Sequence, residues 1–316
     1  MIFFQGLNQR LKITLGKGVY LVHKNSMQRK RSAIGWLFLS PYIIVVGAFL
    51  FTPLAYAGWM SIHTHKLVGG TRLAPLANFK YAFTDATFIS GLERVLLFAA
   101  IQVPIMLFIA LFGALVLDLF NTRLAKVFRI VAFLPYAVPA VFGGVIWGFL
   151  FSTVHGPLPR FLEHLGFHNV NLFATSSFIY LVGNVVTWGC TGFNMIIIYS
   201  ALQGLPKDSY ESAVLDGANQ RQIARYIKIP EITGALGLTS IFAVITATQL
   251  YSEPSILSRF TNGINDGYTP NMYAFRVAFG NAQFNYSAAL SITLAIIVFI
   301  FSFGFIYIAR RRRLKA

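Results

Sequence analysis

The sequence predicts an all-α protein that crosses a membrane about six times. Of its 316 residues, 56% are hydrophobic and only 11% are charged, whereas a soluble domain usually has about 25% charged residues. Six apolar stretches are each long enough for the roughly 20 helical residues that a hydrocarbon core requires. Basic residues gather between these stretches, on one side of the predicted membrane. Together these observations argue against an ordinary soluble domain.

The apolar stretches are predicted to be helices because hydrocarbon offers the backbone no hydrogen-bond partner outside its own segment. Their approximate bounds are 33–60, 92–117, 130–151, 178–202, 232–251 and 288–309. Gly143 and Gly144 predict a close contact between two helices. Helices are expected to bend at the prolines inside the spans, which are Pro41, Pro53, Pro104, Pro135 and Pro139. The longer connections, 61–91, 152–177 and 252–287, are expected to be ordered loops with short helices.

Charge predicts the orientation of the spans. Most of the 26 lysines and arginines lie in the tail 1–31, in the second-to-third and fourth-to-fifth connections, and at the C-terminus. Short segments rich in Lys and Arg face the cytoplasm, so both termini are expected there. This bias accounts for the net charge of +16 without a nucleic-acid partner. Residues 1–31 form a basic tail before a membrane domain at 32–316. The first 26 residues are either an amphipathic piece on the lipid surface or a poorly ordered extension.

The fourth-to-fifth connection, 203–231, predicts two short helices outside the membrane. Pro206 suits the first position of a helix, where its missing N–H has no cost. Gly217 can end that helix with a positive φ. Asn219 and Gln222 have the spacing of a capping box that begins a second helix. Pro230 is expected to stop this second helix near residue 228.

The second of these helices is expected to contact another protein. Ile223 and Ile227 are spaced to share one face of the helix. Outside lipid, such a face needs an apolar partner, and a separate cytoplasmic protein is the simplest choice. The alternative is a structural hairpin that only seals the bundle.

This connection resembles the EAA loop of binding-protein-dependent ATP-binding-cassette (ABC) importers. The family pattern is Glu-Ala-Ala, three residues, Gly, nine further residues, and Ile-x-Leu-Pro. The chain has Glu211-Ser212-Ala213, then Gly217 at the same offset, and then Ile227-Lys228-Ile229-Pro230. It departs from the pattern at Ser212 and Ile229. The segment Phe133-Leu134-Pro135-Tyr136, with Trp147, resembles the third span of carbohydrate-importing permeases, but their Gly-Gly-Pro after the fifth span is missing.

The resemblance implies a type I importer permease in a bacterial inner membrane, which is a transport subunit and not an enzyme. In such importers the loop docks on a cytoplasmic ABC ATPase dimer. A second homologous permease completes the path, and an extracytoplasmic binding protein delivers the solute. The solute is expected to be a sugar or related polar molecule, and the sequence leaves open which one. The resemblance assigns ATPase coupling to Glu211, Ser212, Ala213, Asp216, Gly217, Ala218, Ile223, Ile227 and Pro230.

Polar side chains inside the later spans are candidates for the solute path, since they are costly in lipid unless they face a pore or another helix. Trp188 and Tyr251 are expected to stack on sugar rings. Hydrogen bonds between helices remain the alternative for the polar members of the set. The candidates are Asn184, Thr187, Trp188, Asn194, Thr248, Gln249 and Tyr251.

Other classes of membrane protein lack support in the sequence. A proton-coupled carrier would favour an acid in mid-span, but Glu93 and Asp118 are expected near the ends of the second span. A channel or secondary carrier would favour internal repeats, and an embedded enzyme would favour paired acids or a nucleophile motif. No cofactor or metal site is expected. The one cysteine, Cys190, is expected to be a small buried residue.

Overall fold

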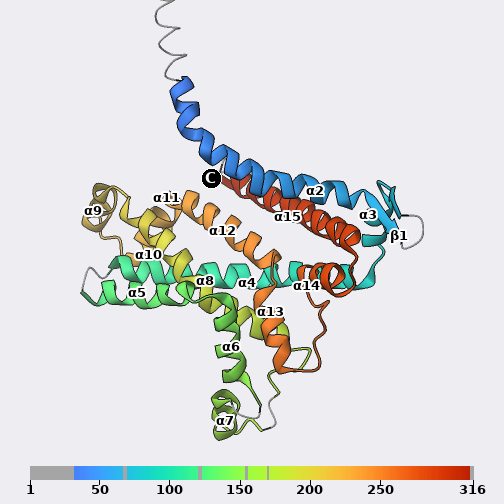
Figure 1. Cartoon of the computed structure of the whole chain (residues 1–316). Coiled ribbons are helices and arrows are strands. Elements are labelled where there is room, and N and C mark those ends of the chain that lie inside the picture. Colours follow the sequence, from blue (N-terminus) through green and yellow to red (C-terminus); the bar gives the residue numbers. More distant parts are fainter. Residues whose placement is uncertain (1–31, 67–69, 120–122, 154–155, 169–170, 314–316) are drawn as a thin grey trace, which may run out of the picture. The chain divides into compact units, whose positions relative to one another are not determined.

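The computed structural model describes residues 32–66, 70–119, 123–153, 156–168 and 171–313. Most of this part of the chain is helical (Figure 1). The chain divides into two compact units, Met1–Trp59 and Met60–Ala316. The predicted tail 1–31 lies outside the described residues.

The first unit contains an apolar helical segment that begins at Ser32. A π-helical turn, η1 (Gly47–Phe51), interrupts it before α2 (Thr52–Ser61), whose last two residues belong to the second unit. The Thr52 N–H donates to the Gly47 carbonyl, five residues back. This wider turn precedes Pro53, which lacks the N–H that a regular α-helical ladder needs. The irregularity at Pro53 is therefore a π-helical turn.

Five described segments are long and apolar enough to cross a membrane. Four of them lie mainly in the second unit: α4 (Ala86–Leu119), α8 (Phe178–Gln203), the stretch Thr233–Phe260 and the Phe284–Gly304 part of α15 (Phe284–Arg313). The stretch Thr233–Phe260 comprises α12 (Thr233–Thr248), α13 (Ser252–Leu257) and η3 (Ser258–Phe260). A bent pair, α5 (Arg123–Ala137) and α6 (Ala140–Phe151), gives up to six spans if it counts as one. The described chain thus confirms the all-α, multi-span prediction.

The third span is not the single helix expected over 130–151. The axes of α5 and α6 differ by 98° at the break between them. Pro139 has an extended ψ of 138° and caps α6. Its ring disfavours helical geometry at the residue before it, and it has no N–H to donate. The helix therefore ends before Pro139, and α6 leaves the direction of α4 and α5 (Figure 1).

Small residues bring the helices of the second unit close together. At Gly192 of α8, a Cβ would lie 1.7 Å from the carbonyl oxygen of Ala132 in α5. At Gly144 of α6, a Cβ would lie 3.0 Å from Ile256 of α13, which confirms the predicted close contact there. Glycine at such crossings lets helix backbones approach where lipid supplies no hydrophobic drive between helices.

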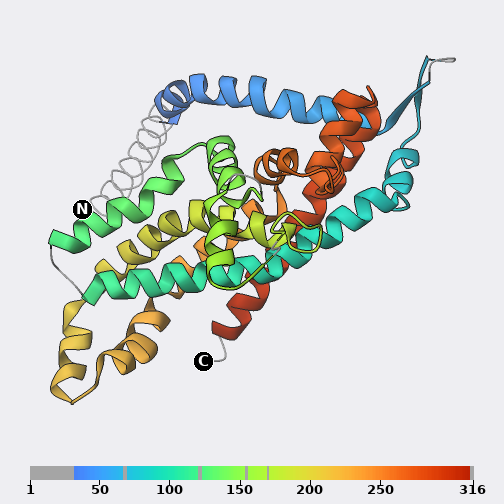
Figure 2. The same ribbon diagram turned by 90° about the horizontal axis from the view of Figure 1, so that it is seen from below.

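Short elements join the spans at the end of the bundle that lies opposite α9 and α10 (Figures 1 and 2). Strands β1 (His63–Lys66) and β2 (Gly70–Leu73) pair antiparallel, with His63 opposite Leu73. Helix α3 (Ala77–Ala82) follows them, and α14 (Pro270–Phe275) with the π-helical turn η4 (Arg276–Gly280) precedes α15. A further short helix, α7 (Pro157–His164), follows α6. Ordered loops with short helices were predicted, but the strands were not.

Asp85 joins α4, α14 and α15 at that end of the bundle. It is 9% exposed, and its Oδ1 accepts the backbone N–H groups of Thr87 and Phe88 at the start of α4. Its Oδ2 accepts the hydroxyl groups of Tyr273 and Tyr286. Burial alone raises the pKa of Asp85, but these four hydrogen bonds together hold that pKa below its ordinary value. Burial and the bond to Asp85 raise the pKa of Tyr273 to about 12.

Asp85→Asn should lower the free energy of unfolding by about 1.5–3 kcal/mol near neutral pH, the contribution typical of hydrogen bonds to a charged group. Because the folded-state pKa of Asp85 is lowered, this stability is present above the ordinary pKa of about 3.9 and is lost as pH falls through the folded value. Thermal unfolding in detergent should therefore show the two proteins converging below about pH 4. The exposed Asp266→Asn is the control, and equal stability of Asp85→Asn and the unmodified protein at pH 7 would contradict the assignment.

Candidate functional site

The segment that carries the EAA pattern forms a hairpin at one end of the bundle (Figure 1). Its first helix, α9 (Lys207–Leu215), has Pro206 as its N-cap, one position before the one expected. Its second helix begins with α10 (Gln220–Ile223), and the predicted capping box is present. Asn219 Oδ1 accepts the Gln222 N–H at 3.0 Å, and Gln222 Oε1 accepts the Asn219 N–H at 2.8 Å.

The turn between the two helices is a Schellman cap. Gly217 has a φ of +84°, as predicted for the residue that ends α9. The Ala218 N–H donates to the Ala213 carbonyl at 2.9 Å, and the Gly217 N–H donates to the Val214 carbonyl at 3.0 Å. These are the two bonds that define this motif. The fixed spacing of Ala213, Gly217 and Ala218 in the EAA pattern is therefore explained by the hydrogen bonds that end α9.

The second helix does not stop before Pro230, as had been expected. After α10 it passes through the π-helical turn η2 (Ala224–Lys228) and continues as α11 (Ile229–Glu231). The Ile229 N–H donates to the Ala224 carbonyl, five residues back. This turn ends two residues before its proline, as η1 does before Pro53. The wider turn accommodates the proline inside the helix.

The hairpin presents most of its pattern residues to solvent. Glu211, Ser212, Asp216, Gly217 and Pro230 are exposed, whereas Ala213, Ala218 and Ile227 are half-buried. Ile223 is only 1% exposed, so the inference that it needs a separate protein was wrong, because the chain itself covers it.

Other apolar side chains of the hairpin are exposed instead. Leu215 is 89% exposed, Tyr226 is 70% exposed and Val214 is 50% exposed. Tyr226 is also part of the wall of a hollow of about 340 Å³ between the two helices. The hollow is lined by Asp216, Gly217, Ala218, Gln222, Ile223, Tyr226 and Ile227. Leu215 and Tyr226 were missed, although apolar residues on a helix outside lipid are a signal for contact with another protein.

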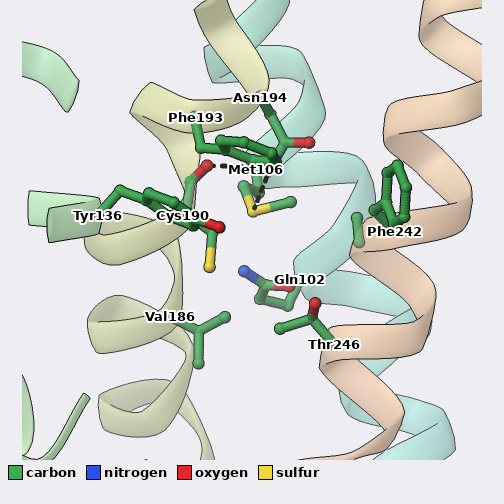
Figure 3. A pocket seen from close by; sticks show the side chains of 10 residues that line it. Gln102, Met106, Tyr136, Val186, Cys190, Phe193, Asn194, Phe242 and Thr246 are labelled. Carbon is green, nitrogen blue, oxygen red and sulfur yellow. Dashed lines mark hydrogen bonds between the residues drawn. The ribbon is translucent and has the colours of Figure 1, made fainter. Parts of the chain in front are cut away.

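A second candidate site is a cavity of about 230 Å³ between α4, α5, α8 and α12 (Figure 3). Its lining residues are Gln102, Met106, Tyr136, Val186, Cys190, Phe193, Asn194, Phe242, Ala243 and Thr246. This volume is below the range of about 300–1000 Å³ usual for small-molecule pockets. In the present conformation the cavity therefore suits part of a ligand.

Two buried oxygen atoms beside the cavity lack a partner among the described residues. Asn194 donates from Nδ2 to the Cys190 carbonyl at 2.9 Å, but its Oδ1 accepts no bond there (Figure 3). Gln102 donates from Nε2 to Thr187 Oγ1 at 3.1 Å, and its Oε1 is likewise unpaired. Buried acceptors normally have partners, so these two oxygens are suited to hydroxyl donors of a ligand or water.

The aromatic side chains at the cavity are not the ones expected. Tyr136 and Phe193 stack with ring centroids 4.4 Å apart, and Phe242 approaches from α12 (Figure 3). Trp188 does not line the cavity. Its ring lies edge-on to that of Trp147, with the ring centroids 5.9 Å apart. Tyr251 also lies outside it, 5.3 Å from the ring of Phe275.

Of the polar residues predicted for the path, Asn194 lines this cavity and the others lie elsewhere. Asn184 and Thr187 line a separate hollow between α4 and α8, which Gln102 also lines. Thr248 is 1% exposed and donates to the Val244 carbonyl of its own helix at 2.8 Å. Gln249 is exposed. Gln102 was missed, although a single Gln inside the apolar second span is the same kind of signal as Asn194.

An acid that was expected in an outer loop lies inside a candidate span. Glu253 was predicted to begin an outer loop, but α13 resumes the helix at Ser252 and places Glu253 within the stretch Thr233–Phe260. Its side chain is half-buried. The described residues contain no group of three His, Cys, Asp or Glu side chains that could hold a metal ion.

Residues 106–315 match the family described as binding-protein-dependent transport system inner membrane component. The chain belongs to this family. The matched region contains the hairpin and most of the residues that line the cavity, so the resemblance inferred from the EAA pattern is confirmed.

Curated relatives of this permease are transport proteins of similar length. A lactose transport system permease protein of Rhizobium radiobacter is 28% identical over 273 residues, which cover 85% of this chain and 91% of the relative. An alpha-glucoside transport system permease protein of Rhizobium meliloti is 27% identical over 81% of this chain and 76% of the relative. These relatives support a transport subunit that is not an enzyme.

A solved structure shares the fold of the permease. A chain of a bacterial ABC transporter that imports the acidic polysaccharide alginate superposes with a TM-score of 0.74. The superposition covers 89% of this chain and 96% of the other, at 19% identity. The similarity confirms the ABC importer permease fold.

Gly217→Ala should destabilise the hairpin by about 1 kcal/mol, the cost of a Cβ at a left-handed position. A steric clash with neighbouring residues is not the cause, since no other atom lies within 4 Å of the added Cβ. Hydrogen exchange should therefore speed up at α9 and α10. Gly204→Ala is the matched control, because Gly204 has a φ of −82°. Equal exchange in both variants would contradict this account.

Proposed function

We propose that this chain is one of two permease subunits of an ATP-driven importer for a sugar or related polar solute. The subunit sits in a bacterial inner membrane with both termini in the cytoplasm. Residues 32–316 act as the permease domain in contact with lipid, and 1–31 act as a basic cytoplasmic tail. A cytoplasmic ABC ATPase dimer drives transport, and an extracytoplasmic binding protein delivers the solute.

The observation that carries this proposal is the capped hairpin that projects from the bundle. Its Schellman turn and capping box make it stiff outside the membrane, and Leu215 and Tyr226 give it exposed apolar surface. A stiff helix with exposed apolar residues is suited to dock in a groove of another protein. The hairpin also lies at the end of the bundle opposite α3 and α14 (Figure 2). It therefore faces the cytoplasm if those elements face outward.

The cavity supports a polar, hydroxyl-rich solute. The unpaired oxygens of Gln102 and Asn194 are suited to accept hydroxyl hydrogens, and the stacked rings of Tyr136 and Phe193 offer an apolar face. Sugars combine these two kinds of surface. The relatives whose names mention lactose and alpha-glucosides favour the same class. A second permease would supply the remaining wall of a cavity that is small in this chain alone.

Glu211→Lys should abolish co-purification of the ATPase while leaving membrane insertion intact. Glu211 is exposed, so reversing its charge costs the fold little and replaces attraction to a basic partner residue by repulsion. The measurement is the amount of ATPase recovered with the tagged permease from membranes.

Glu231→Lys is the matched control for that experiment. Glu231 is also exposed and lies at the other end of the same hairpin, so the same charge change there should leave ATPase recovery close to that of the unmodified protein. Unchanged recovery with Glu211→Lys would remove Glu211 from the docking surface.

Gln102→Leu should weaken the response of ATP hydrolysis to solute without releasing the ATPase. Leu has a similar size but lacks the buried oxygen, so a ligand hydroxyl would lose its acceptor at a cost of about 1–3 kcal/mol, or roughly 5- to 150-fold in the half-saturating concentration. The measurement is ATP hydrolysis by the complex against a panel of sugars with its binding protein.

Gln283→Leu is the matched control, because Gln283 is exposed just before α15 and does not line the cavity. It should leave the sugar response unchanged. If Gln102→Leu also kept the original dose response, the cavity would not be part of the solute path.

A further inference from the structure

A buried ion pair ties the hairpin to the bundle. Lys228 Nζ, at the end of η2, lies 2.6 Å from Asp118 Oδ2, near the end of α4. Each side chain is 10% exposed. Asp118 lies at the end of its span, as expected, and protein covers most of its side chain. Its second oxygen, Oδ1, accepts a hydrogen bond from Gln203 Nε2 of α8 at 2.7 Å.

The same lysine also contacts the first helix of the hairpin. Lys228 Nζ lies 4.9 Å from the centre of the Tyr210 ring in α9, within the range of a cation–π interaction. Arg221 and Arg225 of the second helix are exposed, so Lys228 differs from them in pointing inward. One ammonium group therefore joins both helices of the hairpin to α4, and through Asp118 to α8.

The two helices held by this pair are those that carry the unpaired oxygens of the cavity. Gln102 lies on α4 and Asn194 lies on α8 (Figure 3). Ile223 and its apolar neighbours also hold the hairpin, but apolar contacts are non-directional. A short charge-assisted hydrogen bond has a defined geometry and so resists sliding of the hairpin relative to α4.

We propose that the Asp118–Lys228 pair is the joint through which movement of the hairpin reaches α4, which packs along α8, and so changes the cavity. This inference rests on the proposed docking of an ATPase on the hairpin. It assigns Asp118, Lys228 and Gln203 as positioning residues that touch neither ATPase nor solute.

The test removes both charges together in Asp118→Asn/Lys228→Met. A single replacement would leave one buried charge unpaired, which is strongly destabilising, whereas neutralising both partners is often tolerated.

The complex is purified through this chain with its ATPase and sister permease and placed in lipid vesicles. Cys190 is the one cysteine of the chain and lines the cavity, so its labelling rate reports on cavity access without knowledge of the solute.

The readout is the rate of Cys190 modification by a small methanethiosulfonate reagent, measured on this chain by mass spectrometry with ADP and with ATP plus vanadate. In the unmodified complex we expect the two rates to differ by about fivefold or more, the lower range of allosteric coupling. In the double variant the ratio should fall towards one, while the ATPase remains bound and hydrolyses ATP. The reversed pair, Asp118→Lys/Lys228→Asp, should restore at least part of the ratio.

The matched control is Asp266→Asn/Arg259→Met, which likewise removes one negative and one positive charge, at two exposed positions away from the hairpin. It should keep the original ratio. The inference is overturned if the neutral pair also keeps that ratio, if it releases the ATPase, or if the reversed pair restores nothing. Failure of the proposed function shows in the unmodified complex instead, as absence of a bound ATPase or of any nucleotide effect on Cys190.

Discussion

Hydrocarbon cannot hydrogen-bond to a peptide group, and this constraint shapes the whole chain. Each apolar segment satisfies its backbone as a helix, so every proline inside one must be accommodated locally. In the first apolar segment a π-helical turn ends two residues before Pro53, and the same arrangement precedes Pro230 in the hairpin, outside the candidate spans. At Pro139 the helix breaks and α6 departs at 98°. The same residue type therefore gives a continuous helix in one place and a corner in another.

Outside the bundle, caps supply the hydrogen bonds that the backbone groups at the helix ends need. These caps hold the two helices of the hairpin in a fixed geometry. The Schellman turn at Gly217 and the box at Asn219 close the facing ends of two short helices. Lys228 then joins both helices to α4. The pattern residues of the loop are thus of two kinds. Ala213 and Gly217 build the turn, while Glu211 is exposed on the surface.

The sequence was sufficient for features that depend on local chemistry. Span length, the capping box and the positive φ of Gly217 follow from residues a few positions apart. It was insufficient where the outcome depends on a distant neighbour. Periodicity predicted that Ile223 lies on the apolar face of its helix, but it could not predict that other parts of the same chain cover this face. The role of Asp85 could not be read from nearby positions either, because its tyrosine partners lie about two hundred residues away.

The contact of Gly192 with Ala132 has a geometrical consequence. With no side chain between them, α5 and α8 touch backbone to backbone, and this crossing lies next to Phe193 and Asn194 at the cavity. The same two helices also touch through the stacked rings of Tyr136 and Phe193 and through Arg129 over Tyr199, so their contact extends over several turns. A larger residue at position 192 would therefore force α5 and α8 apart along this length and displace one wall of the cavity.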